Sequence, residues 1–259
     1  MVEATTVKQL LEAGAHFGHQ TGHWHPRMKK HIFTQRNGIH IIDLEQTAVM
    51  LEKACAFVRD LVSSGESILF VGTKRQAQEA IEEEAKRCAM YYVNQRWLGG
   101  MLTNFVTIQG RIDYLVRIED RKNRGELDYL TKKEKMKMEK EIARLNKLMG
   151  GFKEMVKLPA ALFIVDPTKE KIAMAEARKM SIPIVAMVDT DCNPANIDYI
   201  IPSNDDAIKA IKLVCGRIAT AVLEGRAVKE SGEAGMAAEE SKAAESSELL
   251  ETHVFTPES

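Results

Sequence analysis

The chain has 259 residues, of which 45% are hydrophobic, and a formal net charge of −1. That length can bury the core of one main domain with a smaller appendage, and no apolar run approaches the roughly 18 residues that a membrane span needs. The first residues have neither the basic start nor the apolar segment of a secretory signal. We therefore expect a cytoplasmic protein with no membrane partner.

The charge is distributed unevenly along the chain. Residues 227–259 contain eight glutamates against two lysines, a charge of −6, so residues 1–226 carry +5. The terminal segment is rich in Glu, Ala and Ser and poor in apolar residues, and we expect 227–259 to be a disordered acidic tail. The basic remainder is compatible with a nucleic-acid partner.

Six of the seven histidines lie between residues 16 and 40. Zinc is one interpretation, but their spacings match no familiar structural zinc pattern and no cysteine joins them. Basic residues with interleaved aromatic rings are at least as natural for binding an RNA backbone and stacking on bases. We predict RNA contacts from five residues of this loop: His19, Trp24, Arg27, Lys29 and Arg36.

Short apolar runs then alternate with amphipathic segments. Strands are expected at 40–42, 68–71, 90–93, 161–165, 184–188 and 199–201, and helices at 46–63, 74–88, 169–180 and 205–223. Apolar strands separated by helices predict a parallel sheet covered on both faces. The fold class is therefore a doubly wound, Rossmann-like α/β domain, formed by residues 1–106 and 159–226.

The expected strand at 68–71 runs through Gly72 into a helix start, the place where nucleotide enzymes bind phosphate. Neither the G-x-x-x-x-G-K-[ST] loop nor the G-x-G-x-x-G fingerprint is present, and there is no nucleophile elbow. We expect no enzyme, no small-molecule substrate and no required cofactor. Lys74 and Arg75 could contact an RNA phosphate, with plain helix packing as the alternative. A free Rossmann-like nucleotide-binding protein is the alternative function.

Residues 94–104 read Asn-Gln-Arg-Trp-Leu-Gly-Gly-Met-Leu-Thr-Asn. Arginine offers paired donors to phosphate, adjacent glycines allow close approach of a main chain, and neutral polar side chains fix orientation. We predict that this segment binds RNA through five residues: Asn94, Arg96, Trp97, Thr103 and Asn104.

Between residues 107 and 158 the charged residues crowd together, and apolar residues recur at steps of three and four, the seam of paired helices. We predict an antiparallel coiled-coil hairpin inserted at 107–158, with a turn at 123–128. Residues 110–158 contain fourteen Lys and Arg against nine Asp and Glu. A solvated helix face could show this surplus by itself.

Three aspartates are expected at the carboxyl ends of parallel strands: Asp189, Asp191 and Asp205. Together with His16 they could hold zinc or magnesium, because both metals accept carboxylate oxygens and zinc also accepts imidazole. In the alternative interpretation these aspartates only cap loops and a helix start.

Five motifs occur in one order along the chain, at 16–20, 24–28, 70–75, 94–104 and 201–208. Together they resemble the bacterial family of small-ribosomal-subunit protein two, over about residues 7–225. His25 departs from the asparagine of many relatives, and the segment after Gly225 lies outside the resemblance.

This resemblance implies flavodoxin-like strand order and a non-catalytic role in the small ribosomal subunit. The implied partners are small-subunit ribosomal RNA, neighbouring ribosomal proteins, and ribosomal protein one, which the family helps to dock. The resemblance also favours the metal site and a hairpin that grips RNA or protein. For the hairpin we predict RNA contacts at Arg121, Lys122, Lys132 and Lys133.

Overall fold

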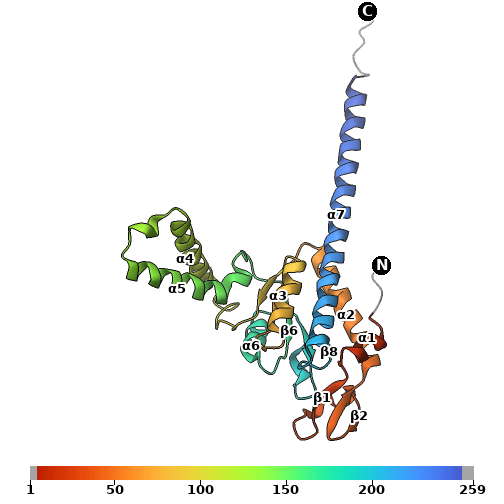
Figure 1. Ribbon diagram of the computed structural model, residues 1–259. Coiled ribbons are helices and arrows are strands. Elements are labelled where there is room, and N and C mark those ends of the chain that lie inside the picture. Colours follow the sequence, from red (N-terminus) through yellow and green to blue (C-terminus); the bar gives the residue numbers. More distant parts are fainter. Residues whose placement is uncertain (1–4, 253–259) are drawn as a thin grey trace, which may run out of the picture.

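The computed structural model describes residues 5–252, with side chains at 5–127 and 129–231. At its centre lies a five-stranded parallel sheet (Figure 1). Its strands are β4 (Ile68–Val71), β5 (Tyr91–Val93), β6 (Ala161–Val165), β7 (Ile184–Val188) and β8 (Tyr199–Pro202). They pair in the order β5-β4-β6-β7-β8. Counted along the chain this order is 2-1-3-4-5, the flavodoxin-like order that the resemblance implied.

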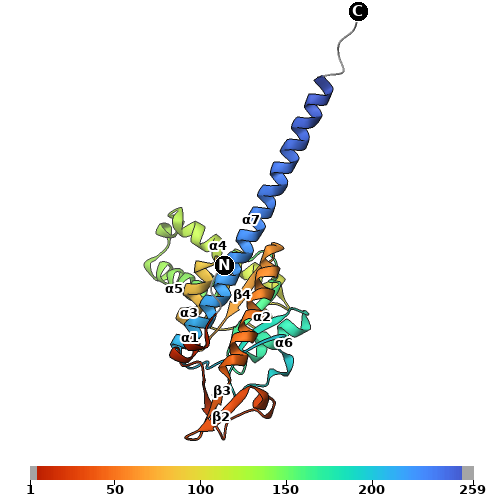
Figure 2. The same ribbon diagram turned by 90° about the vertical axis from the view of Figure 1, so that its right-hand side faces the viewer.

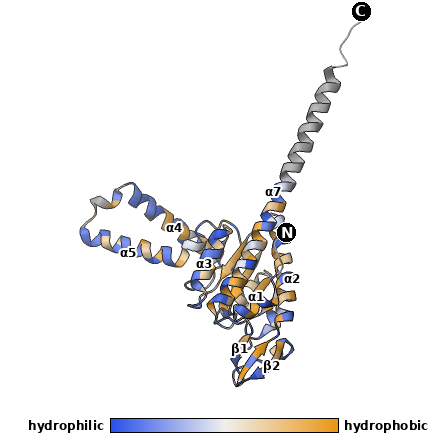
Figure 3. Ribbon diagram, turned by 45° about the vertical axis from the view of Figure 1, so that its right-hand side comes forward, coloured by the Kyte–Doolittle hydropathy of each residue, from blue (hydrophilic) through white to orange (hydrophobic). Residues whose placement is uncertain are grey.

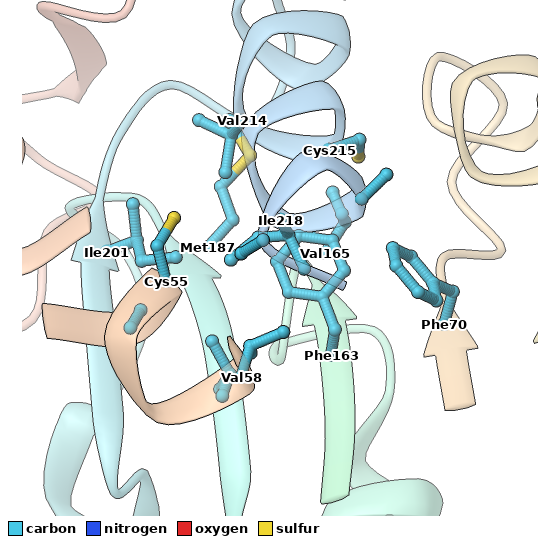
Figure 4. Close-up of a cluster of buried hydrophobic side chains, with 14 of the residues drawn as sticks. Cys55, Val58, Phe70, Phe163, Val165, Met187, Ile201, Val214, Cys215 and Ile218 are labelled. Atoms are coloured by element: carbon cyan, nitrogen blue, oxygen red, sulfur yellow. The ribbon is translucent and has the colours of Figure 1, made fainter. Parts of the chain in front are cut away.

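Helices cover both faces of the sheet, because every residue of β4, β6 and β7 is buried and both faces need apolar cover. One face carries α2 (Leu44–Ser63), α3 (Gln78–Arg87) and α7 (Ile208–Thr252), and the other carries α6 (Lys171–Lys179). Figure 4 shows part of the first core cluster, in which side chains of α2 and α7 meet Phe70, Phe163, Val165, Met187 and Ile201.

Helix α2 shows how the sequence produces these elements. The Asp43 carboxylate accepts hydrogen bonds from the backbone N–H groups of Glu45 and Gln46, at 3.0 and 3.3 Å, and so caps the helix start. Buried residues recur at steps of three and four, which places them on one face. They are Leu44, Thr47, Leu51, Ala54, Cys55, Val58 and Val62.

A strand forms at the expected residues 40–42, but it does not belong to the parallel sheet, so only its predicted place is wrong. It is part of β3 (Ile39–Ile42), which forms a separate antiparallel sheet with β1 (Phe17–Gln20) and β2 (Ile32–Arg36), in the order β1-β3-β2 (Figure 2). The cause is the turn between β2 and β3. Asn37 and Gly38 both have positive φ, 51° and 75°, as a two-residue hairpin requires. We call residues 16–42 the antiparallel module.

Two helix boundaries differ from the expected ones. The helix expected to start at residue 74 begins at Gln78, because residues 74–77 form a turn first, closed by a hydrogen bond from the Ala77 N–H to the Lys74 carbonyl oxygen. Helix α7 begins at Ile208 and continues to Thr252, across most of the segment expected to be disordered. Ala and Glu favour helix, and a helix already packed on α2 propagates more easily than it nucleates. Disorder over 227–259 is thus not confirmed, and 253–259 lie outside the described residues.

The inserted segment is a helical hairpin that projects from the sheet (Figure 1). It consists of α4 (Phe105–Asn123), a short 3-10 turn (Glu126–Tyr129) and α5 (Lys132–Met149). Most of its length is hydrophilic, with hydrophobic turns near the base (Figure 3). Coiled-coil packing in the strict sense stays a prediction. At the base a 3-10 turn, Gly150–Phe152, packs on β5, so the hairpin shares the second core cluster with the sheet.

The remaining described elements are α1 (Val7–Glu12) and the 3-10 turns Pro26–His31 and Pro194–Asn196. A capping box starts α1, in which Thr6 and Gln9 exchange hydrogen bonds through their side chains and backbone N–H groups. Among the helices within residues 5–252, none is long and apolar enough to cross a bilayer.

Candidate nucleic-acid interface

The sixteen side chains predicted to contact RNA differ in exposure. Three are buried, namely Lys74, Asn94 and Trp97, and His19 and Trp24 are half-buried. The other eleven are exposed: Arg27, Lys29, Arg36, Arg75, Arg96, Thr103, Asn104, Arg121, Lys122, Lys132 and Lys133. Only exposed groups are free to meet a phosphate backbone without rearrangement, so the structure divides the predicted set.

Lys74 points into the protein. Its Nζ lies 2.6 Å from a carboxylate oxygen of Asp205, 2.6 Å from one of Asp206 and 3.6 Å from one of Asp166. Burial alone would lower the pKa of Lys74, but the hydrogen bonds with Asp205 and Asp206 raise it above the ordinary value. The lysine therefore neutralises the buried carboxylates of Asp166 and Asp205, and the exposed one of Asp206, which does not fit the predicted contact with an RNA phosphate.

The position next to Lys74 where such a sheet would bind a ligand is also occupied by the protein's own groups. In a 2-1-3-4-5 sheet, ligands bind where the strand order reverses, here between the carboxyl ends of β4 and β6. The buried Glu170 carboxylate accepts hydrogen bonds there from the backbone N–H and the hydroxyl of Thr73, at 3.0 and 2.5 Å. A nucleotide phosphate would have to displace this carboxylate and face Asp166 and Asp205 as well. The geometry disfavours a free nucleotide-binding protein.

The predicted metal ligands come together only in part. The backbone N–H of Asp205 lies 3.4 Å from a carboxylate oxygen of Asp189, and nearby Asp191 is half-buried. His16 does not join them: its ring lies against that of Phe17 in a tilted arrangement, with the ring centroids 4.0 Å apart, and burial lowers its pKa.

His19 takes the place expected for His16. Its Nδ1 lies 3.1 Å from a carboxylate oxygen of Asp189. Within the described residues, His19, Asp205 and Asp206 offer ligand atoms within 4.8 Å of one another. Burial and the charges of Asp166 and Asp189 raise the pKa of Asp205 to about 7. Because Lys74 already pairs with Asp205 and Asp206, a cation would compete with its ammonium. Zinc or magnesium was predicted to bind at the three aspartates with His16, and this binding stays a prediction.

The contact of His19 with Asp189 predicts a pH dependence. The hydrogen bond that the His19 ring N–H donates to the Asp189 carboxylate raises the pKa of His19 to about 9, above its ordinary 6.5. Stabilisation by the charged pair is thus complete below pH 6.5 and is lost as pH rises through about 9. We expect wild type to lose roughly 1–2 kcal/mol of unfolding free energy over this range, allowing for solvent screening. The measurement is urea unfolding at pH values between about 7 and 9.5.

His19→Gln should lack this loss, whereas His23→Gln, at an exposed histidine, should keep it. Equal pH dependence in wild type and His19→Gln would show that the contact with Asp189 does not stabilise the protein.

Thr190, directly after β7, fastens the antiparallel module to the domain. Its hydroxyl oxygen accepts a hydrogen bond from the His19 N–H and its carbonyl oxygen accepts one from the His25 N–H, both at 2.8 Å. Gly18 is needed for this approach, because a Cβ there would lie 2.6 Å from the Thr190 side chain. Sequence reasoning did not identify Thr190, since its partners lie far away in the chain.

The segment after β5 uses most of its polar groups internally. Asn94 donates to the Glu82 carboxylate at 2.8 Å, and the Trp97 indole N–H donates to Glu176 of α6 at 3.1 Å. Both side chains are buried, which does not fit their predicted RNA contact. Glu176 was missed, although it follows buried Ala173 by three positions on α6, and a carboxylate at a core-facing position must find hydrogen-bond donors.

The exposed cations of the predicted set lie at three places: the sheet edge, the hairpin, and the end of β2, where Arg36 precedes the turn of the antiparallel module. Arg75 follows β4 and Arg96 follows β5, while Arg27 and Lys29 lie in the module fastened beyond β7. All four therefore lie at the carboxyl edge of the sheet, and we call them the sheet-edge surface. Among the residues with described side chains, none forms an ion pair with them. The four predicted hairpin cations lie apart, on the projecting arm (Figure 1).

Comparison with known proteins gives one consistent result. Residues 10–225 match the family described as Ribosomal protein S2. The chain is similar to a protein of Dehalococcoides mccartyi strain 195 named small ribosomal subunit protein uS2, with 66% identity over 222 residues, 86% of this chain and 91% of the relative. The protein of that name from strain BAV1 is 65% identical over the same shares. The matched segment contains every residue of the candidate interface.

Proposed function

This chain belongs to the ribosomal protein S2 family, and from that membership we propose that its sheet-edge surface binds small-subunit ribosomal RNA. The family consists of structural ribosomal proteins rather than enzymes. The chain is accordingly a cytoplasmic protein of the small ribosomal subunit, with ribosomal RNA and other ribosomal proteins as its general partners.

The RNA proposal rests on one observation: at the sheet edge most carboxylates point into the protein, whereas the arginines are exposed. The carboxylates at the sheet edge are largely turned inward, where Lys74 and hydrogen-bond donors compensate them. Arg75 and Arg96 are exposed and have no ion-pair partner among the residues with described side chains. A phosphate backbone would supply the missing anions, and arginine can offer it two donors at once.

We further propose that the hairpin contacts RNA and neighbouring ribosomal proteins. It carries cations next to exposed apolar side chains, including Tyr129 at 94% and Met136 at 48% exposure. A shallow groove between its helices is lined by Tyr114, Leu130 and Met138 with three charged residues. This mixture suits a protein partner as well as RNA. Docking of ribosomal protein one rests on the family resemblance.

The test is the salt dependence of binding. Purified protein is titrated onto small ribosomal subunits that lack it, at several KCl concentrations. Arg96→Ala and Arg75→Ala should each weaken binding, and each lost phosphate contact should flatten the plot of log affinity against log salt by roughly 0.7–0.9. The protein should remain folded, because both side chains are exposed.

The matched control is Lys179→Ala, which removes an exposed cation from the end of α6 at the opposite edge of the sheet. It should leave the slope unchanged. Wild-type slopes in both arginine variants would remove the sheet edge from the RNA interface. A chain that fails to sediment with small subunits in a sucrose gradient would instead behave as a free protein.

A further inference from the structure

One buried carboxylate organises the whole segment that follows β5. Glu176 of α6 is 8% exposed, and it has no ion-pair partner among the residues with described side chains. Instead it accepts five hydrogen bonds from residues 97–103. Burying a carboxylate costs free energy unless its oxygens accept hydrogen bonds. The burial of Glu176 and the conformation of residues 97–103 therefore depend on each other.

The two oxygens of Glu176 divide the donors between them. Oε1 accepts from the Trp97 indole N–H at 3.1 Å and from the Gly100 backbone N–H at 2.8 Å. Oε2 accepts from the backbone N–H groups of Leu102 and Thr103, at 3.0 and 3.2 Å, and from the Thr103 hydroxyl at 3.1 Å. Burial alone would raise the pKa of Glu176, but these hydrogen bonds hold it below the ordinary value. The group is therefore an anion at neutral pH.

The backbone of the segment is shaped to wrap this anion. Gly100 has a φ of +87°, a conformation that other residues adopt with strain, and a Cβ there would lie 3.2 Å from that of Asn104. At the adjacent Gly99 a Cβ would meet no atom within 4 Å. Wrapping turns the polar groups of Trp97, Gly100 and Leu102 inward. Arg96 and Asn104, at the two ends of the wrapped segment, remain exposed.

We propose that Glu176 is a positioning residue for RNA binding: it holds residues 96–104 in one conformation that presents Arg96 to RNA, without touching RNA itself. This inference rests on the proposed function and deepens it. The physical gain is preorganisation, since a segment already ordered loses less conformational entropy when it binds.

A double-mutant cycle separates this role from a purely structural one. Glu176→Gln is isosteric, but it replaces one acceptor oxygen by an NH2 group that faces N–H donors. We expect Glu176→Gln to weaken binding to small subunits lacking the protein by roughly 5- to 20-fold. Arg96→Ala should cost roughly 5- to 10-fold in wild type, but less than about twofold in the Glu176→Gln background.

The sign of this effect is informative. Glu176→Gln removes a negative charge, which by simple electrostatics would strengthen binding to RNA. The control Glu79→Gln removes an exposed negative charge from α3 and should leave binding unchanged or slightly tighter. If Glu176→Gln weakens binding and Glu79→Gln does not, the loss of negative charge cannot be the cause, because it would tighten binding. The weaker binding would then result from a changed conformation of residues 96–104.

Two glycine variants give an independent route to the same conformation. Gly100→Ala should strain the wrapped backbone and weaken binding with the same dependence on Arg96. The matched control is Gly216→Ala in α7, where an added Cβ makes only ordinary contacts, and this variant should bind like wild type. Thermal unfolding, followed by circular dichroism, identifies a temperature at which all variants are folded, and the binding assay is run there. If Glu176→Gln is too unstable to be assayed, the two glycine variants test the proposal.

The outcomes separate the two proposals. Wild-type affinity in both Glu176→Gln and Gly100→Ala, or effects that simply add to that of Arg96→Ala, would overturn the positioning role while RNA binding by Arg96 stands. Unchanged affinity and salt slope in Arg96→Ala itself would refute the RNA contact of this segment, and the positioning role with it.

Discussion

Replacing Lys74 with alanine is expected to lower the free energy of unfolding by about 3–5 kcal/mol, because it leaves buried carboxylates without their cation. Asp166 and Asp205 are both buried, and Lys74 is the lysine that meets them. The measurement is urea unfolding at pH 7.5. The destabilisation should shrink at about pH 5, since carboxyl groups whose pKa is raised take up protons and lose their mutual repulsion.

Arg75→Ala is the matched control, one position away on an exposed side chain. It should change stability by no more than about 0.5 kcal/mol, although it weakens RNA binding. We thus expect Lys74 to contribute to stability and Arg75 to RNA binding. Equal stability of the two variants, with weaker RNA binding in Lys74→Ala, would place the lysine on the RNA surface after all.

Phe152→Ala is expected to cost about 3–5 kcal/mol, the usual range for removing a fully buried aromatic side chain. Phe152 lies in the 3-10 turn that packs on β5, where a Cβ added to Gly151 would overlap the carbonyl oxygen of Tyr92. This contact makes the base of the hairpin part of the sheet core. Val156→Ala, at a side chain that is 79% exposed, should be nearly neutral in the same denaturant titration.

The outer hairpin should behave differently from its base. Asn146 donates a hydrogen bond to Glu119 at 2.5 Å across the two helices, so a short Gly-Ser linker can replace residues 120–145 between them. We expect this truncated chain to unfold cooperatively near the wild-type midpoint and to assemble less well into small subunits. If truncation costs as much stability as Phe152→Ala, the core extends further into the hairpin than we infer.

The parallel sheet could be predicted from the sequence. Buried strands of a doubly wound domain are continuously apolar, and in the helices between them apolar residues recur at steps of three and four, as in α2. It also contained the signal that corrects the strand at 40–42. Asn37-Gly38 is a strong hairpin sequence, and it pairs this strand with β2 rather than with the parallel strands.

The candidate site was predictable only in its exposed part. Lys74, in a glycine-led helix start, has the local sequence of a phosphate contact, but its partner Asp205 lies 131 positions away. Trp97 likewise meets Glu176 at a separation of 79 positions. Such pairs depend on how the chain is wound through the sheet, which local spacing does not encode. Arg75 and Arg96 are exposed, as an RNA contact requires, and their contact with RNA stays a prediction.

The fastening of the antiparallel module by Thr190 has a consequence for synthesis on the ribosome. The hydrogen bond from His19 to Thr190 joins residues 171 positions apart. A chain is made from its amino terminus at about 5–20 residues per second, and contacts of long sequence separation form late. The histidine-rich module is therefore synthesised among the first segments but must wait, undocked and basic, for several seconds or more until the end of β7 has emerged.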